Sequence, residues 1–254
     1  MIKITCVVDD ISKRNSDFWS EHGLSFWIET KHGNVLFDTG QTASVLGHNM
    51  ALLAVNPQSL SAVALSHAHY DHTGGLAYVL SKNKNLKIYA HSDIFQPRYS
   101  LREGEYKSIG MSISPEELSH NGKLILSDKP NEIIPNLWTT GEISARPEPE
   151  GRSAHHFVRV DNRWIPDPYM DDLSLVLQTE EGLVVICGCC HAGLLNTLFH
   201  VKRTFKSPII AVLGGTHLVT ADDEYIDHVI DVLNNRFEHI RLYPNHCTGE
   251  HTYE

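Results

Sequence analysis

The sequence lacks long apolar runs, an excess of basic residues and a regular set of cysteines. No apolar run approaches the roughly 18 residues needed to cross a bilayer, so we expect no membrane partner. Lys and Arg number 21 against 31 Asp and Glu, a formal net charge of -10. This balance argues against nucleic acid as the main partner, because phosphate binding needs a basic face. The five cysteines are an odd number with three clustered, which does not resemble a disulfide framework.

The first ten residues are too charged and too strand-like for a secretory signal. Together with the cysteine pattern, this predicts a reducing, cytoplasmic location. No helical repeat or low-complexity segment divides the 254 residues, of which 41% are hydrophobic. We therefore expect a single domain over residues 1–254, with its oligomeric state left open.

Hydrophobic periodicity predicts a layered α/β protein with two sheets and outer helices. The predicted strands are 2–7, 24–30, 34–37, 60–65, 86–90, 173–178, 183–187, 208–213 and 239–243. The predicted helices are 42–55, 76–80, 192–203 and 222–234. The stretch from about 92 to 168 holds most of the prolines and no sustained period, and we interpret it as an irregular lid or insertion.

The sequence is rich in histidine, with 17 residues, and three of them lie in His67-Ala-His69-Tyr-Asp71-His72. This motif directly follows the predicted strand 60–65. Three imidazoles and a carboxylate suit Zn, Mn, Fe or Co. The alternative is a solvated turn, but a buried cluster of this kind is costly without a cation. The following Thr73-Gly-Gly75 is interpreted as a sharp backbone turn.

This motif, followed by Thr-Gly-Gly, resembles the metal-binding motif of the metallo-β-lactamase superfamily. Other landmarks of the resemblance recur in order along nearly the whole chain. They are Phe37-Asp38-Thr39-Gly40, Gly188-Cys-Cys-His191-Ala-Gly193, Gly214-Gly-Thr-His217 and Pro244-Asn-His246-Cys247-Thr-Gly. Their combination is similar to a subgroup that includes archaeal dihydropteroate-type synthases of methanopterin biosynthesis.

The resemblance implies a four-layer αββα sandwich that holds one or two divalent ions, with Zn expected and Mn or Fe as alternatives. It assigns His67 and His69 to a first ion and Asp71 and His72 to a second. By the order of the motifs, His191 completes the first set and His246 the second. Asp71 is the predicted catalytic residue, because it lies beside the metal-activated water and can orient it or take its proton.

The chain departs from the family at the residue that bridges the metals. Ordinary hydrolases of the superfamily have Asp after Gly where this chain has Gly188-Cys189. The candidates for its replacement are Asp171, Asp172, Cys189 and Cys190, and a thiolate is an accepted Zn ligand. Packing of both cysteines at a strand end is the favoured alternative.

Six further polar residues are candidates for orienting a ligand or binding substrate. His217 follows a predicted strand between two ligand loops, and a purely structural role is equally consistent with its position. His155, His156 and Arg146 lie in the irregular middle, where they either reach the metals and an anionic substrate or belong to a surface loop. Asp172 and Cys189 complete this group.

Three functions follow from these residues. The first is a metal-dependent hydrolase acting on a small, anionic molecule such as a phosphate ester. The second is a pterin-linked transferase of the dihydropteroate-synthase type. The third is a metal-bound sensor or binding protein without catalysis, against which the completeness of the motif argues.

Overall fold

The computed structural model describes residues 2–237 and 239–253. The chain groups into two compact units, each built from two separate stretches. Unit 1 comprises Met1–Asp128 and Ser153–Asp171, and unit 2 comprises Lys129–Arg152 and Asp172–Glu254. The single domain expected over 1–254 stays a prediction. No helix within the described residues is long and apolar enough to cross a membrane.

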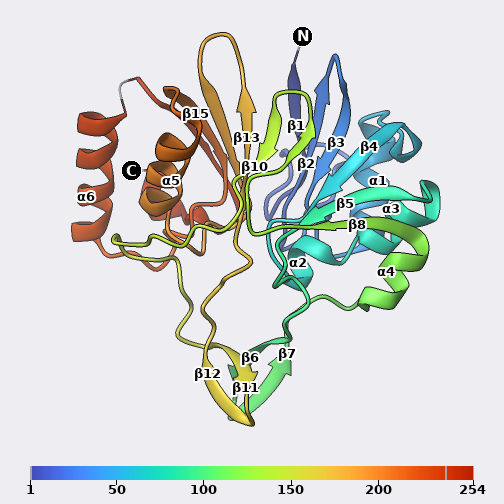
Figure 1. The fold of residues 1–254 in the computed structure, drawn as a ribbon, viewed down its shortest axis with the longest axis horizontal. Coiled ribbons are helices and arrows are strands. Elements are labelled where there is room, and N and C mark those ends of the chain that lie inside the picture. Colours follow the sequence, from blue (N-terminus) through green and yellow to red (C-terminus); the bar gives the residue numbers. More distant parts are fainter. Residues whose placement is uncertain (1, 238, 254) are drawn as a thin grey trace. The chain divides into compact units, whose positions relative to one another are not determined.

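The first sheet, in unit 1, has six strands (Figure 1). In spatial order they are β1 (Lys3–Val8), β2 (Ser25–Thr30), β3 (Gly33–Phe37), β4 (Leu60–Ala64), β5 (Leu86–Ala90) and β8 (Gly122–Leu126). The pairs from β1 to β3 are antiparallel, and those from β3 to β8 are parallel.

Three helices share one apolar core with this sheet: α1 (Ala43–Leu52), α3 (Leu76–Lys82) and α4 (Pro115–Asn121). Leu46, Val79 and Leu118 enter this core from the three helices. The start of α1 is fixed by Thr42, whose side chain accepts a hydrogen bond from the Val45 amide. The short helix η1 (Pro57–Ser59) leads into β4.

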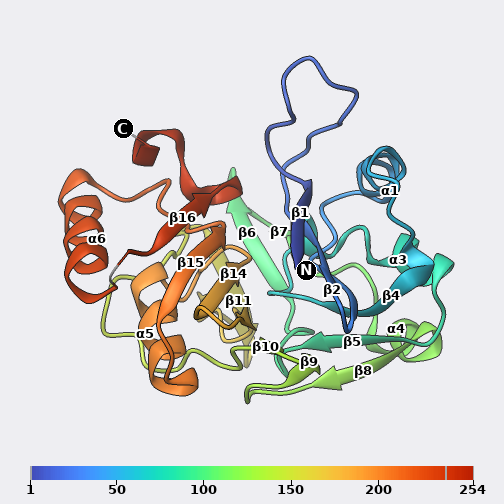
Figure 2. The ribbon, with the colours of Figure 1, turned by 90° about the horizontal axis from the view of Figure 1, so that it is seen from above.

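The sheet of unit 2 also has six strands (Figure 2). In spatial order they are β16 (Arg241–Pro244), β15 (Ile209–Gly214), β14 (Leu183–Cys187), β13 (Ser174–Gln178), β10 (Leu137–Thr139) and β9 (Glu132–Ile134). The first three are mutually parallel. Helices α5 (Leu194–Phe205) and α6 (Asp223–Arg236) pack on it through Leu198, Val229 and Leu233. The short helices η2 (His246–Thr248) and η3 (Glu250–Tyr253) follow β16.

The strands and helices predicted outside 92–168 are confirmed to within a few residues, and with them the mixed α/β class. Their apolar residues either recur at the helix or strand period or form a short continuous run. In α6, for example, Val229 and Leu233 are buried while Ile230 is exposed.

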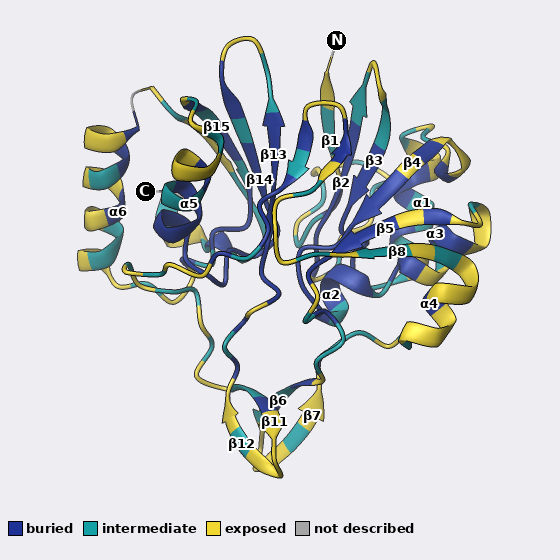
Figure 3. Cartoon of the chain, viewed as in Figure 1, coloured by how far each residue is buried: buried dark blue, intermediate teal, exposed yellow. Residues whose placement is uncertain are grey.

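The stretch over 92–168, which we expected to be irregular, contains several short strands. Besides α4, β8, β9 and β10, this stretch forms a third, four-stranded sheet in unit 1 (Figure 1). Its strands, in spatial order, are β12 (Arg163–Pro166), β11 (His156–Val160), β6 (Arg98–Arg102) and β7 (Glu105–Ser108). These strands are short and mostly solvent-exposed (Figure 3). The hairpins β6–β7 and β11–β12 are local, and the pairing of β6 with the distant β11 joins them into one sheet.

The loops with polar motifs follow the carboxyl ends of neighbouring parallel strands, where ligands bind in open α/β sheets. In unit 1, Asp38 follows β3, and His67 follows β4 and precedes helix α2 (Tyr70–Thr73). In unit 2, Cys189, His217 and His246 follow β14, β15 and β16 respectively. In each sheet, the candidate functional side chains therefore lie at one edge, beyond the carboxyl ends of the parallel strands.

Gly74 and Gly75 form the expected turn between α2 and α3. Their φ angles are ordinary, -67° and -83°, so no left-handed turn is involved. A Cβ on Gly74 would lie 1.9 Å from the Gln41 carbonyl oxygen, and one on Gly75 would lie 2.2 Å from that of Thr39. Glycine is needed because the loop after β3 packs directly on α2.

We predict that Gly74→Ala destabilises the protein, because backbone atoms must move to admit the methyl group. The expected loss is about 1–3 kcal/mol or more in the free energy of unfolding, measured by urea denaturation. Gly47→Ala is the control, since its Cβ would meet only the movable ring of Tyr78, at 3.0 Å. Equal effects of the two substitutions would contradict the close-packing argument.

Candidate metal centre

The motif histidines of unit 1 form a buried cluster of rings. His67 and His72 are fully buried, and His69 is 5% exposed. The ring centroid of His67 lies 4.5 Å from that of His69 and 4.3 Å from that of His72. His67 lies in the loop between β4 and α2, and His72 lies on α2. The helix brings the ring of His72 next to that of His67.

A buried carboxylate and a hydroxyl orient two of these rings. Asp38 Oδ2 lies 2.7 Å from both His72 Nδ1 and the Ser66 hydroxyl, and Oδ1 accepts from the Ser66 amide at 2.7 Å. The Ser66 hydroxyl also lies 2.8 Å from His67 Nδ1. If Ser66 donates to Asp38, it accepts from His67 Nδ1–H. Both rings then carry a proton on Nδ1, which leaves Nε2 as the atom that would ligate a metal.

Asp71 lies between two imidazoles. Its Oδ2 is 3.3 Å from His72 Nε2 and 3.4 Å from His22 Nε2. His22 is held from its other side by Asp10, whose Oδ2 lies 3.2 Å from His22 Nδ1. This hydrogen bond raises the pKa of His22. Sequence reasoning missed His22, because it stands alone before β2 and outside the motif.

The electrostatics of the cluster suit a cation. Burial lowers the pKa of His72, but the Asp71 and Asp38 carboxylates outweigh it and hold that pKa well above its ordinary value. Burial dominates at His69 and lowers its pKa well below the ordinary value, so this ring is neutral. A bound cation would therefore replace a proton on His72 and find His69 ready to coordinate.

The motif backbone is fixed by a buried ion-pair network. Asp171 Oδ2 accepts from the Ala68 amide at 2.8 Å, and Oδ1 lies 2.6 Å from the fully buried Arg98 guanidinium. Arg98 also contacts Asp167 at 3.1 Å and Asp93 at 2.9 Å. Burial raises the pKa of Asp167 to about 6 despite Arg98. Oδ2 of Asp171 thus holds the backbone between His67 and His69, while Oδ1 is paired with Arg98.

In unit 2, the rings of His191 and His217 lie together with centroids 4.5 Å apart. His191 Nδ1 donates to the Gly151 carbonyl at 2.7 Å, which directs Nε2 away from that loop. Asp172 Oδ2 accepts from the Ala192 amide at 2.8 Å and so anchors the loop after His191. His246 Nε2 lies 3.3 Å from Cys189 Sγ.

The neighbouring thiols differ in their surroundings. Cys247 Sγ donates to the Cys189 carbonyl at 3.5 Å. Burial raises the pKa of Cys247, but the side chain of Cys189 and the nearby His246 and His217 lower it to about 5. Cys190 instead belongs to the apolar core of unit 2, where its pKa is raised.

The three residues expected on a lid lie in different surroundings. His156 belongs to β11, its ring lies 5.0 Å from that of His69, and its Nδ1 is 2.9 Å from the Tyr169 hydroxyl. His155 is exposed. The Arg146 guanidinium, in unit 2, is paired with Glu150 at 2.8 Å. Of these three, His156 contacts the motif residue His69 of its own unit.

The donor set of unit 1 fits a divalent metal. It combines buried imidazole nitrogens with a carboxylate, the ligands preferred by Zn and acceptable to Mn and Fe. Outer partners on Nδ1, as seen for His67 and His72, accompany nearly all metal-ligating histidines.

Comparison with known proteins identifies the family. The model of the metallo-beta-lactamase superfamily matches residues 21–192, more than half of the chain. The chain belongs to the metallo-beta-lactamase superfamily. A crystal structure titled as Tm1679, a metal-dependent hydrolase of the beta-lactamase superfamily, superposes with a TM-score of 0.82 at 31% identity. The match covers 100% of this chain and 91% of that one, and confirms the metallo-β-lactamase fold.

Two curated relatives from Methanocaldococcus jannaschii match along almost the full chain. The 7,8-dihydropterin-6-methyl-4-(beta-D-ribofuranosyl)-aminobenzene-5'-phosphate synthase is 34% identical, over 98% of this chain and 88% of the relative. An uncharacterized protein is 31% identical over 98% of this chain and 91% of the relative. The resemblance to the archaeal synthase subgroup is therefore confirmed.

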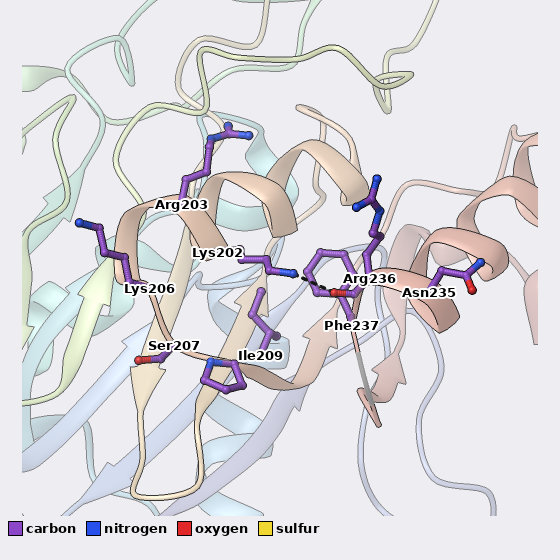
Figure 4. Close-up of a pocket in the computed structure, with 9 residues that line it drawn as sticks. Lys202, Arg203, Lys206, Ser207, Ile209, Asn235, Arg236 and Phe237 are labelled. Carbon is purple, nitrogen blue, oxygen red and sulfur yellow. Dashed lines mark hydrogen bonds between the residues drawn. The ribbon is translucent and has the colours of Figure 1, made fainter.

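A basic hollow of about 730 Å³ lies in unit 2, away from the motif loops of that superfamily (Figure 4). Its cations are Lys202, Arg203, Lys206 and Arg236, at or just beyond the carboxyl ends of α5 and α6. Positive side chains stabilise helix carboxyl ends. Lys202 also donates to the Arg236 carbonyl at 2.9 Å and lies over the Phe237 ring. These structural roles account for the charge.

We predict that Asp38→Asn weakens metal binding about 10–100-fold, the usual cost of losing a partner behind a ligand. The amide keeps the shape of the side chain. If its oxygen accepts from the Ser66 amide, its NH₂ faces His72 Nδ1 and drives the ring proton onto Nε2. Zinc affinity, measured by competition with a chelator, reports the change.

The matched control is Asp93→Asn, which removes a carboxylate from Arg98 and from no motif histidine. Unchanged zinc affinity in Asp38→Asn, or an equal loss in Asp93→Asn, would contradict this assignment.

Proposed function

We propose that the protein is a metal-dependent hydrolase of a small, anionic molecule. The observation that carries the proposal is the buried cluster of His67, His69, Asp71 and His72, with rings oriented by Asp38 and Ser66. Nothing in the stability of unit 1 requires three buried imidazoles to lie together. The likeness to Tm1679, titled as a metal-dependent hydrolase, supports the same reaction class.

The proposed ligands are His67, His69, Asp71 and His72 from unit 1, with His191 and His246 from unit 2 assigned by the family resemblance. Zinc is the proposed metal, as one or two ions. A divalent ion held by such ligands supplies a water activated near neutral pH and polarises a substrate oxygen.

The residues of this chain have distinct proposed tasks. Asp71 accepts a proton or orients the water, because its Oδ2 already lies between two imidazole nitrogens. Asp38 and Ser66 fix ring tautomers. Asp171 holds the motif backbone through the Ala68 amide, which keeps the donors in place.

A pterin-linked transferase is the second candidate. It is favoured by the 34% identity to the M. jannaschii synthase over nearly the full length of both chains. The two candidates share the metal and differ in the acceptor of the transferred group. We propose a small-molecule substrate and a cytoplasmic location in both cases.

Metal content tests the ligand set. We predict that His69→Ala and His246→Ala each lower the metal bound per chain, measured by elemental analysis, while circular dichroism shows a retained fold. His155→Ala is the control, because this histidine is exposed and should leave the metal content unchanged. Wild-type metal content in both ligand variants would refute the set.

A substrate screen separates the functions. The hydrolase predicts turnover of a phosphodiester, lactone or thioester that is abolished by Asp71→Asn and by chelators. Turnover of a pterin pyrophosphate with an arylamine, without such hydrolysis, would favour the transferase instead. A folded, metal-loaded protein inactive in every assay would favour the binding or sensor role.

A further inference from the structure

We propose that His22 is a substrate-binding residue, which hydrogen-bonds through Nε2 to the group on which the metal centre acts. The proposal rests on the proposed function, since it places the substrate beside Asp71 and the metal. His22 belongs to unit 1 and lies near the end of the long loop between β1 and β2 (Figure 2). It is separate in sequence from the histidine motif.

The first support is that the chain is held on both sides of His22. Before it, Glu21 Oε1 accepts a hydrogen bond from the Gln41 amide at 2.9 Å. After it, the Leu24 amide donates to the Asp71 carbonyl at 3.3 Å. Contacts of the neighbouring residues therefore fix His22 against helix α2, and none of them involves its ring.

Gly23 makes this close approach to Asp71 possible. It has a φ of +145°, and a Cβ at this position would lie 2.4 Å from the Asp71 carbonyl oxygen. Because that oxygen belongs to the backbone of α2, any side chain here would push the loop away from the helix. The glycine after His22 therefore keeps the histidine next to the motif.

The second support is the orientation of the His22 ring. Asp10 Oδ1 accepts from the Gly23 amide at 3.0 Å, and Asp10 Oδ2 lies 3.2 Å from His22 Nδ1. Because Asp10 engages Nδ1, Nε2 is the ring atom that faces Asp71, 3.4 Å from its Oδ2. That same oxygen lies 3.3 Å from Nε2 of His72. His22 Nε2 thus lies beside the oxygen to which we assign proton transfer or orientation of the water.

The third support is the exposure of the ring. The His22 side chain is 57% exposed, whereas those of Asp71 and His72 are 7% and 0% exposed. An exposed ring adds little to the apolar core, and fixing it costs side-chain entropy. Binding residues, by contrast, lie on loops that a rigid scaffold positions. The His22 ring is therefore accessible to a ligand from solvent, while the motif rings are buried as ligands to an ion.

This position indicates what the substrate must offer. It needs polar oxygens that reach both the metal centre and His22 Nε2. A phosphate or carboxylate group meets this requirement, since one oxygen can face the metal while another hydrogen-bonds to the imidazole. We therefore expect His22 to favour substrates with such an oxyacid group over neutral ones.

Phosphate binding to the zinc-loaded protein tests the proposal. Inorganic phosphate is titrated into the wild type, His22→Ala, His22→Asn and His22→Gln by calorimetry, with zinc content measured in parallel. The amide of Gln reaches about as far as Nε2, whereas that of Asn reaches only about as far as Nδ1. We expect the Kd to rise about 10–100-fold in the Ala and Asn variants, the usual effect of one hydrogen bond to a charged group, and the Gln variant to bind like the wild type.

His32→Ala is the matched control, because His32 is an exposed histidine in the turn between β2 and β3 and should leave phosphate affinity unchanged. All variants should keep the zinc content of the wild type. Wild-type phosphate affinity in His22→Ala, failure of Gln to restore binding, zinc loss in His22→Ala, or no phosphate binding by the zinc-loaded wild type would overturn the proposal and leave the proposed function intact. A folded wild type that binds no zinc would instead overturn the proposed function itself.

Discussion

The buried Asp38 carboxylate is the interaction on which the candidate centre depends. Through 2.7 Å contacts it fixes His72 directly and His67 by way of Ser66. Its own position is set by the end of β3, where it has a φ of +56°, and by the loop that packs on Gly74 and Gly75. A carboxylate without solvent must be matched by donors, and the donors here are the Ser66 amide, the Ser66 hydroxyl and the His72 ring. The contacts that stabilise the buried Asp38 carboxylate are therefore also the contacts that orient the candidate metal ligands.

The two units share one structural arrangement. In each unit, neighbouring parallel strands end at one sheet edge, and an aspartate holds the backbone of a ligand loop. Asp171 does so for the His67 loop and Asp172 for the His191 loop. Such anchors suppress small displacements, to which metal affinity is sensitive. In this superfamily the loops determine which substrate is bound, so the fold alone does not identify the substrate.

Sequence reasoning succeeded where a local period or a compact motif carried the information. The strands before His67 and His191 were predictable because each is a short, nearly continuous apolar run. The third sheet was not, because β6 pairs with β11 and its buried Arg98 looks like a surface residue. His22 was missed since only tertiary contacts bring it to Asp71. Cys189 and Cys190 have identical chemistry and adjacent positions, so only their surroundings distinguish them.

The central claim is that these oriented imidazoles exist to hold a metal. Anomalous diffraction at the zinc edge, from crystals of protein purified without chelators, tests it most directly. The account predicts a peak about 2.0–2.1 Å from the Nε2 atoms of His67 and His69, the usual Zn–N distance. Ordered histidines with no anomalous peak, after zinc has been supplied, would contradict it.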